Sequence, residues 1–150
     1  MKKKILIVGG SGFIGTNILK KIDKLKYKIF ATKFKNKNFF AVKKVKYLKG
    51  DIRNLDFCKK ITKSADTVIM CAAVSSGSMI IQNNPMYHVD DNIKMNLNIL
   101  KACSVNRVKK FVFISSNTVY PISKKPMKEK DVNYSLFHKY FNVGWMKIFS

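Results

Sequence analysis

The sequence of 150 residues has few acidic side chains, few cysteines and few histidines. It contains 8 Asp+Glu against 30 Lys+Arg, and Glu129 is its one glutamate. The three cysteines, Cys58, Cys71 and Cys103, are widely spaced and form no CxxC pair, and the sequence has two histidines. We therefore expect neither a disulfide framework nor a metal site. The cysteines are expected to be reduced and to pack as small apolar residues.

A long hydrophobic run is also missing. Near the start the longest run is 5–8, too short for the apolar region of a signal peptide, and no later run approaches ~18 apolar residues. We therefore expect a cytoplasmic protein with no membrane span. Because 47% of the residues are hydrophobic, the chain is not of the disordered class, and its length predicts one domain over residues 1–150.

The formal charge of +22 comes almost entirely from lysine, which accounts for 28 of the 30 basic residues. Dedicated nucleic-acid surfaces usually favour arginine, whose planar fork grips phosphates and guanines. Here the lysines are scattered along a chain that is also rich in Ile, Asn and Phe, residues with A/T-rich codons. We interpret the charge mainly as compositional background with an affinity for anionic small molecules. Nucleic-acid binding is the less favoured alternative.

Short apolar runs alternate with longer amphipathic segments. Strands are predicted at 4–8, 27–32, 45–48, 67–73 and 111–115, and helices from 14 to about 25, at 55–64, at about 85–104 and at 136–149. Such alternation predicts right-handed crossovers and a parallel sheet with helices on both faces. The expected fold class is therefore α/β, a doubly wound parallel sheet in three α/β/α layers.

A glycine-rich turn joins the first predicted strand to the first predicted helix. Gly9, Gly12 and Gly15 are spaced GxxGxxG, with a strand before them and a helix after them. In a dinucleotide-binding turn, the first glycine permits the tight turn, the second lets the backbone approach a pyrophosphate, and the third allows close helix packing. The amides near Phe13 and Ile14 would then point at the phosphates with the positive end of the helix dipole. A plain strand–helix turn is the alternative.

This spacing resembles short-chain dehydrogenase/reductases. Further motifs resemble the extended branch of NAD(P)-dependent nucleotide-sugar epimerases and dehydratases, with a Rossmann-type fold. They are 50–53 (GDIR), Cys71-Ala72-Ala73, the segment from Asn92 to Asn98, and 109–120 (KKFVFISSNTVY). The similarity covers essentially the whole chain in order. It implies that Asp51 and Ile52 contact adenine, that Ala72 and Ala73 lie under the cofactor, and that Asn92 belongs to the cofactor site.

The choice of cofactor depends on the end of the second predicted strand. A carboxylate there would bind the ribose 2′-hydroxyl of NAD. The sequence has no acid at this point but has Lys33, Lys35 and Lys37, which would attract a 2′-phosphate. We therefore favour NADP(H) slightly over NAD(H), the alternative being that these lysines are part of the general excess.

The resemblance also implies a catalytic serine, tyrosine and lysine. Counted back from Tyr120, the serine is Ser116, with Thr118 as an auxiliary hydroxyl. The family's tyrosine and lysine are four residues apart on one helix face, where the lysine lowers the tyrosine pKa. No Tyr-x-x-x-Lys exists in this chain. By position Tyr140 is the best candidate, with Tyr134 second.

The residue four places after Tyr140 is Gly144, and the nearest downstream lysine is Lys147. Positions i+4 and i+7 lie about 60° apart around a helix, so Lys147 is a possible surrogate. Alternatively Lys147 is solvated and the tyrosine is not activated.

The length of the chain is the second feature, after the missing Tyr-x-x-x-Lys, in which it differs from the family pattern. Extended members of the family carry further strands and a smaller C-terminal substrate domain, so we expect the fold to be incomplete on its C-terminal side and a chain of weak or no activity. The expected partner of the chain is either a missing C-terminal half or, in a homodimer, a second copy of the chain. The predicted function is a nucleotide-sugar epimerase or dehydratase, and the alternative is a dinucleotide-binding sensor module whose catalytic pair has decayed.

Overall fold

The computed structural model describes residues 2–36 and 39–150. These residues form two compact units, one drawn from residues 2–36, 39–73 and 95–114 and the other from residues 74–94 and 115–150. Lys37, one of the three lysines considered for NADP(H), lies outside the described residues. The expectation of one domain stays a prediction.

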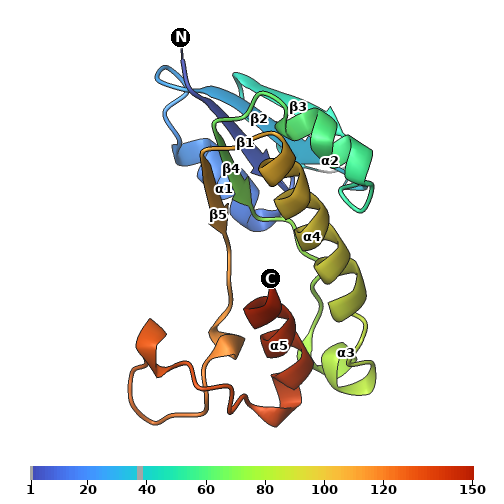
Figure 1. The fold of residues 1–150 in the computed structure, drawn as a ribbon, viewed down its shortest axis with the longest axis vertical. Coiled ribbons are helices and arrows are strands. Elements are labelled where there is room, and N and C mark those ends of the chain that lie inside the picture. Colours follow the sequence, from blue (N-terminus) through green and yellow to red (C-terminus); the bar gives the residue numbers. More distant parts are fainter. Residues whose placement is uncertain (1, 37–38) are drawn as a thin grey trace. The chain divides into compact units, whose positions relative to one another are not determined.

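The first unit contains a five-stranded parallel sheet (Figure 1). Its strands are β1 (Lys4–Val8), β2 (Lys28–Lys33), β3 (Val45–Lys49), β4 (Thr67–Met70) and β5 (Lys110–Phe113), in the order β3-β2-β1-β4-β5. Every neighbouring pair is parallel. The order reverses after β1, since β2 and β3 lie on one side of it and β4 and β5 on the other. This is the topological switch point of a doubly wound sheet, so the predicted fold class is confirmed.

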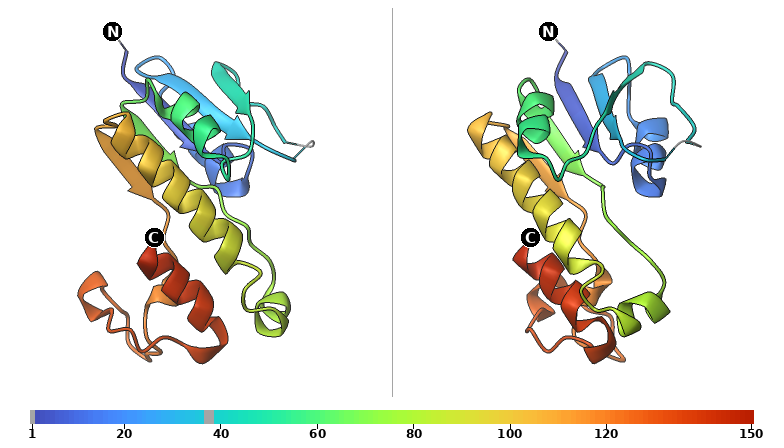
Figure 2. Two further views of the ribbon diagram at one scale, coloured as in Figure 1. Left: turned by 45° about the vertical axis from the view of Figure 1, so that its right-hand side comes forward. Right: turned by 90° about the vertical axis from the view of Figure 1, so that its right-hand side faces the viewer.

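Helices cover both faces of this sheet (Figure 2). On one face α1 (Phe13–Lys21) buries Leu19 against Ile5, Ile7 and Ile29. On the other lie α2 (Leu55–Thr62) and the part of α4 (Val89–Val105) that belongs to this unit. The two layers of helix leave the β1 side chains from Ile5 to Val8 almost inaccessible, with Leu6 and Ile7 at 0% exposure. This burial matches the unbroken aliphatic run from which the strand was predicted.

The second unit consists of short helices and loops. It holds α3 (Ser78–Asn83), the start of α4, the 3₁₀ turns η1 (Asn117–Val119), η2 (Glu129–Asp131) and η3 (His138–Tyr140), and α5 (Phe141–Phe149). An antiparallel bridge joins Pro121 to Leu136. The helix α5 packs against η1, so the segment expected to carry the serine and the segment expected to carry the lysine lie side by side in this unit.

Several element boundaries differ from the sequence predictions. The first helix ends at Lys21 because Ile22 is extended and the Asp23 carboxylate accepts the Leu25 and Lys26 amides, forming a turn. Leu25, expected on the apolar helix face, is 71% exposed. The fourth strand ends at Met70 rather than at 73, so its three following residues belong to the loop.

The last two helices also begin later than predicted. The long helix begins at Val89 rather than near 85, and the preceding α3 was not foreseen. The final helix begins at Phe141 rather than at 136, because Leu136 takes part in the bridge with Pro121 and 138–140 form a 3₁₀ turn. Apolar spacing alone did not reveal this pairing, since it joins residues far apart in sequence.

The cysteines are free thiols, as expected, and two of them are buried in the core. Burial raises the pKa of Cys58 to about 12 and those of Cys71 and Cys103 to about 11, so all three stay protonated at neutral pH. In the part of the chain that the structure describes, no cluster of His, Cys, Asp and Glu is arranged to hold a metal. Within the same residues, none of the helices has both the length and the apolar character needed to cross a bilayer.

Candidate functional site

The glycine turn occupies the carboxyl end of β1 at the switch point of the sheet. Gly9 has a φ of +84°, a backbone conformation that L-residues with side chains rarely adopt. A Cβ on Gly9 would also lie 2.6 Å from the backbone nitrogen of Ala72. Glycine is therefore required at position 9 twice over, by the turn and by the close approach of the segment that follows β4.

Gly15 and Gly12 differ in what surrounds them. A Cβ on Gly15 would collide with the Gly9 carbonyl oxygen, so this glycine lets the first turn of α1 pack directly on the glycine turn. A Cβ on Gly12 would meet Gly9 O alone, at 3.3 Å. The space beyond Gly12 is therefore open, as expected if a ligand approaches the backbone there.

The amino end of α1 carries unpaired amides. The first hydrogen bond into the helix is Thr16 N to Gly12 O, at 2.9 Å. Among the described residues, no group accepts a hydrogen bond from the backbone N–H groups of Phe13, Ile14 and Gly15. Gly12 provides no side-chain cap and the first turn has no acidic residue. The positive end of this helix is therefore free to bind an anion.

Three polar side chains that sequence reasoning missed hold the turn in place. The buried Thr32 hydroxyl, at the end of β2, accepts a hydrogen bond from Gly9 N at 2.8 Å. Thr16 Oγ1 donates to Gly10 O at 3.2 Å, and Asn36 Nδ2 donates to Ser11 O at 3.0 Å. The available signal for Thr32 and Asn36 was weak, a hydroxyl or amide at or after the end of the second strand, and the fold brings these two residues to the turn.

Asp51 and Arg53 form an ion pair after β3. Arg53 Nη2 lies 2.7 Å from Asp51 Oδ2, and Arg53 Nε donates to both carboxylate oxygens. The side-chain hydrogen bond from Arg53 holds the pKa of the Asp51 carboxyl below its ordinary value. Asp51 is therefore an anion with one guanidinium partner already in place. Its expected contact with adenine stays a prediction.

Lysines and aromatic rings surround the carboxyl end of β2. Lys33 Nζ lies 4.9 Å from the Phe39 ring centroid, and Lys35 Nζ lies 5.3 Å from that of Phe34. The Arg53 guanidinium also lies over Phe34, at 5.6 Å. Cations and flat apolar rings therefore meet at this end of the sheet, a combination that suits a nucleoside phosphate.

Ile52, Ala72 and Ala73 lie near the same edge of the sheet. Ile52 is 6% exposed, so its side chain belongs to the core. Its carbonyl oxygen accepts a hydrogen bond from Asn98 Nδ2 at 3.3 Å. Ala72 is half-buried beside Gly9, and Ala73 is exposed. The small side chains of the two alanines therefore leave space beside the glycine turn, which a ligand lying across the strand ends requires.

Asn92 binds the backbone of its own unit. Its Nδ2 donates to Val74 O at 2.9 Å and to His88 O at 2.5 Å, and its Oδ1 accepts from Val74 N at 2.9 Å. The side chain is 3% exposed. Asn92 therefore ties the loop after β4 to the first turn of α4. Whether Asn92 also belongs to the cofactor site stays a prediction.

Ser116 and Thr118 are brought together by the η1 turn. The Ser116 hydroxyl accepts hydrogen bonds from Thr118 N at 3.2 Å and from Thr118 Oγ1 at 3.0 Å. Ser116 also caps the amino end of η1. Both hydroxyls are therefore held in a defined geometry, as a positioned hydrogen-bonding pair would need to be.

Tyr140 and Lys147 do not lie on one helix as the sequence analysis assumed. Tyr140 ends η3 and is the N-cap of α5, and its φ of −120° and ψ of 16° are not those of an α-helix. Lys147 lies within α5 and is half-buried, and burial lowers the pKa of its ammonium group. The pairing of Tyr140 with Lys147 assumed that both residues lie two turns apart on one helix, and this spacing therefore does not apply. The catalytic role of each residue stays a prediction.

Gly144 marks the face of α5 that contacts the serine loop. It is buried, and a Cβ there would lie 2.5 Å from Thr118 O and 2.8 Å from Leu136 Cδ1. A lysine four residues after Tyr140 is therefore sterically excluded. Counting back four residues from Lys147 leads instead to Val143, which shares a helix face with Lys147. Reading the Tyr-x-x-x-Lys spacing backwards from the lysine was the signal that sequence reasoning missed.

The parallel sheet and the glycine turn with unpaired amides define a Rossmann-type nucleotide-binding fold. The comparisons with known proteins then specify the family. The model of the NAD dependent epimerase/dehydratase family matches residues 5–141. The chain belongs to this family, which confirms the resemblance inferred from its motifs.

Individual relatives cover most of this chain, while the chain covers less than half of each. GDP-mannose 3,5-epimerase 1 of Oryza sativa subsp. indica is 31% identical over 137 residues, 90% of this chain and 35% of the relative. A bifunctional UDP-glucose 4-epimerase and UDP-xylose 4-epimerase 1 of Pisum sativum is 28% identical over 162 residues, 98% of this chain and 45% of the relative. The structure of UDP-glucose 4-epimerase from Bifidobacterium longum in complex with NAD+ and UDP has a TM-score of 0.82 at 26% identity, covering 98% of this chain and 46% of that one.

We predict that Gly144→Ala destabilises the second unit by about 1–3 kcal/mol, because the new methyl group overpacks against a backbone carbonyl. The matched control is Gly77→Ala, since a Cβ on Gly77 meets nothing within 4 Å. The control should cost at most ~1 kcal/mol, the usual loss at a helix N-cap. Chemical denaturation followed by the fluorescence of Trp145, the one tryptophan, measures both. Equal losses in the two variants would contradict the close contact between α5 and η1.

Proposed function

We propose that this chain provides the dinucleotide-binding part of an NAD(P)-dependent epimerase or dehydratase that acts on a nucleotide-sugar. The names of the relatives support this substrate class, since they are GDP-mannose and UDP-glucose epimerases. The chain spans less than half the length of these relatives, so the activity proposed is that of a protein containing this chain.

One observation carries the proposal. At the end of β1, the amides of Phe13, Ile14 and Gly15 lack partners among the described residues, and the turn that presents them has no side chain at Gly12. Three N–H donors at the positive end of a helix suit the two negative phosphates of a dinucleotide. The residues present therefore fit the cofactor that the family uses.

Each part of the site has a proposed task. The amides of α1 bind the pyrophosphate, Asp51 and Ile52 receive the adenine, and Ala72 and Ala73 leave room for the body of the dinucleotide. Asn92 keeps the loop after β4 in place by its three backbone bonds. Ser116 and Thr118 orient the reacting hydroxyl of the sugar. When bound, the nicotinamide supplies hydride transfer, which protein side chains do not provide.

The first prediction for this proposal concerns Gly12. In Gly12→Ala the methyl group projects into the open space where the pyrophosphate would approach, so we expect at least tenfold weaker binding of NADH and NADPH. The fold should be kept within ~1 kcal/mol, because the methyl group meets Gly9 O alone, at 3.3 Å. Fluorescence titration of the reduced dinucleotides measures binding, and thermal unfolding measures stability.

Gly15→Ala is the matched comparison for this prediction. Its Cβ would collide with the Gly9 carbonyl, so it should lose about 1–3 kcal/mol of stability together with binding. If wild-type protein binds neither NADH nor NADPH, or if Gly12→Ala binds both as well as the wild type, the proposed site is wrong.

We propose a preference for NADP(H), supported by the cations at the end of β2. The Lys33 ammonium, placed over Phe39, and that of Lys35 would attract a 2′-phosphate. Lys33→Met should weaken NADPH binding about fivefold, ~1 kcal/mol for a partly exposed charge pair, and leave NADH binding unchanged. Lys101→Met, an exposed helix lysine, is the control for the loss of one charge. Equal weakening of both dinucleotides would rule out a role for Lys33 in cofactor choice.

A second candidate function is a dinucleotide-binding module without turnover, and Val143 favours it. If Lys147 is the lysine of the family's Tyr-x-x-x-Lys, then the tyrosine position holds a side chain that transfers no proton. We propose on this ground that the chain is weakly active or inactive toward nucleotide-sugars, with Tyr140 as the remaining candidate for the acid/base group. A missing C-terminal half or a second copy of the chain is the proposed partner of the active form.

Val143→Tyr tests this assignment without any substrate. A tyrosine at 143 would lie one helical turn before Lys147, so its phenol should ionise well below the usual pKa near 10. Ultraviolet difference titration of the variant against the wild type isolates the added phenol. The effect should disappear in Val143→Tyr combined with Lys147→Met. A new phenol that titrates in the usual range in both variants would show that position 143 does not face Lys147.

A further inference from the structure

A buried histidine links the loop after β4 to the turn before α4, within the second unit. His88 lies in that turn and is 3% exposed. Its Nε2 lies 2.9 Å from the hydroxyl oxygen of Ser76, in the loop 74–77. Its Nδ1 is buried as well and has no hydrogen-bond partner among the described residues. Because buried polar atoms are almost always paired, this nitrogen requires an explanation.

Both tautomers of the neutral imidazole leave one buried nitrogen unsatisfied. If Nε2 accepts a hydrogen bond from the Ser76 hydroxyl, Nδ1 carries an N–H group without an acceptor. If Nε2 donates to that hydroxyl, Nδ1 has an unpaired lone pair. A protonated ring would place an N–H group on both nitrogens and a positive charge in the same buried position. The closed arrangement therefore accommodates a neutral His88 better than a charged one.

No charged group compensates for the burial of this imidazole. The loop 74–77 and α3 contain no ionisable side chain, and the turn before α4 contributes Tyr87, whose ring centroid lies 5.1 Å from that of His88. The start of α4 and η3 carry the other ionisable side chains of the neighbouring segments, which are Asp90, Asp91, Lys94, His138, Lys139 and Tyr140. Burial alone lowers the pKa of the His88 imidazole, so none of these groups stabilises its charged form.

The contact between Ser76 and His88 holds a segment that has few other anchors. Ser76 precedes Gly77, the N-cap of α3, and α3 has no buried residue of its own. Asn92 bonds the same loop at Val74, two residues earlier, through an amide that does not titrate. Protonation of His88 can therefore break the contact at Ser76 and leave the one at Val74 intact.

The helix α3 forms one wall of a hollow of about 600 Å³ in the second unit. Ile81 and Gln82 of α3 line one side of it, and Leu136 and Phe141 line the other. The turn η3, which packs against α3, ends at Tyr140, the candidate for the acid/base group. A change in the position of α3 would therefore change both this hollow and the surroundings of η3.

We propose that His88 is a pH-dependent latch, whose neutral imidazole holds the loop 74–77 and α3 closed against η3 and whose protonation releases them. In the open form the cationic ring is solvated by water. Because burial lowers the pKa of His88 in the closed form below the ordinary value of 6.5, the open form binds the proton more readily. The closed form is therefore fully favoured above about pH 6.5 and loses stability as the pH falls below that value.

Amide hydrogen exchange measured by NMR tests the latch on this chain without any ligand. The amides of Ile81 and Asn84 bond to carbonyls of α3 and its N-cap, and the amide of Cys58, in α2 of the first unit, is the reference. Each exchange rate is divided by that of an unstructured chain at the same pH, which removes the direct effect of pH. Between about pH 7.5 and about pH 5, protection at Ile81 and Asn84 should fall at least ~threefold, while that at Cys58 stays within ~twofold.

Three variants assign the effect to the latch. His88→Gln has no titrating group at this position, so the pH dependence of α3 protection should disappear. The matched control His138→Gln removes the exposed histidine of the same unit and should keep that dependence. Ser76→Ala keeps the imidazole but removes its partner, so α3 should open at a higher pH than in the wild type.

Several results would overturn the proposal. Protection of α3 that is the same at both pH values is the first, and a pH dependence that survives in His88→Gln or disappears in His138→Gln is the second. A loss at Cys58 as large as that at Ile81 would indicate general unfolding in place of a latch. A Ser76→Ala protein identical to the wild type would show that this contact does not hold α3. NADH binding tests the glycine turn separately, so these results leave the proposed dinucleotide function untouched.

Discussion

The site depends on one constraint, the approach of three backbone segments at the carboxyl end of β1. Gly9 lies against the backbone of Ala72, and Gly15 lies against the Gly9 carbonyl, so a side chain at either glycine would force the segments apart. The same approach fixes the start of α1, whose first amides have no acceptor among the residues that the structure describes. Hydrogen bonds from Gly9 to Thr32 and from Asn36 to Ser11 hold the turn once it has formed.

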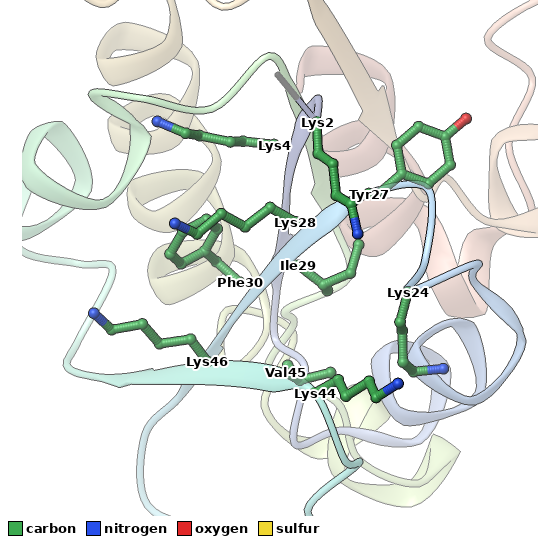
Figure 3. Close-up of a pocket in the computed structure, with 10 residues that line it drawn as sticks. All are labelled: Lys2, Lys4, Lys24, Tyr27, Lys28, Ile29, Phe30, Lys44, Val45 and Lys46. Atoms are coloured by element: carbon green, nitrogen blue, oxygen red, sulfur yellow. The ribbon is translucent and has the colours of Figure 1, made fainter.

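The two ends of the sheet differ in the charged and polar groups that they carry. At the carboxyl ends of the strands, backbone amides and Lys33 attract an anion, and the Asp51 carboxylate is partnered by Arg53. At the amino ends, Lys4 of β1, Lys28 of β2 and Lys46 of β3 project from one face of the sheet (Figure 3). Lysines therefore occur at both ends of the strands, in a chain whose formal net charge is +22.

Much of the first unit could be predicted from the sequence, because its signals are local. The aliphatic run of β1 and the glycine spacing each depend on neighbouring residues, and the strand and the start of the helix that they predict are confirmed. The polar contacts were not predictable, since Thr32 and Asn36 reach the turn from across the sheet edge. In the second unit the start of α5 was predicted wrongly because the Pro121–Leu136 bridge replaces helix at that point. Val143, four residues before Lys147, was missed because the tyrosine was placed by its distance from the motifs that precede it.

A backbone amide NMR titration with NADPH tests the glycine turn as the dinucleotide site. We predict that the largest shifts, with slowed hydrogen exchange, occur at Phe13, Ile14 and Gly15, because the pyrophosphate would supply the acceptors these amides lack. The amides of β5, at the far side of the sheet, serve as the internal reference and should shift little. Saturable binding that leaves these three amides unchanged while shifting residues elsewhere would contradict the claim that the glycine turn is the dinucleotide site.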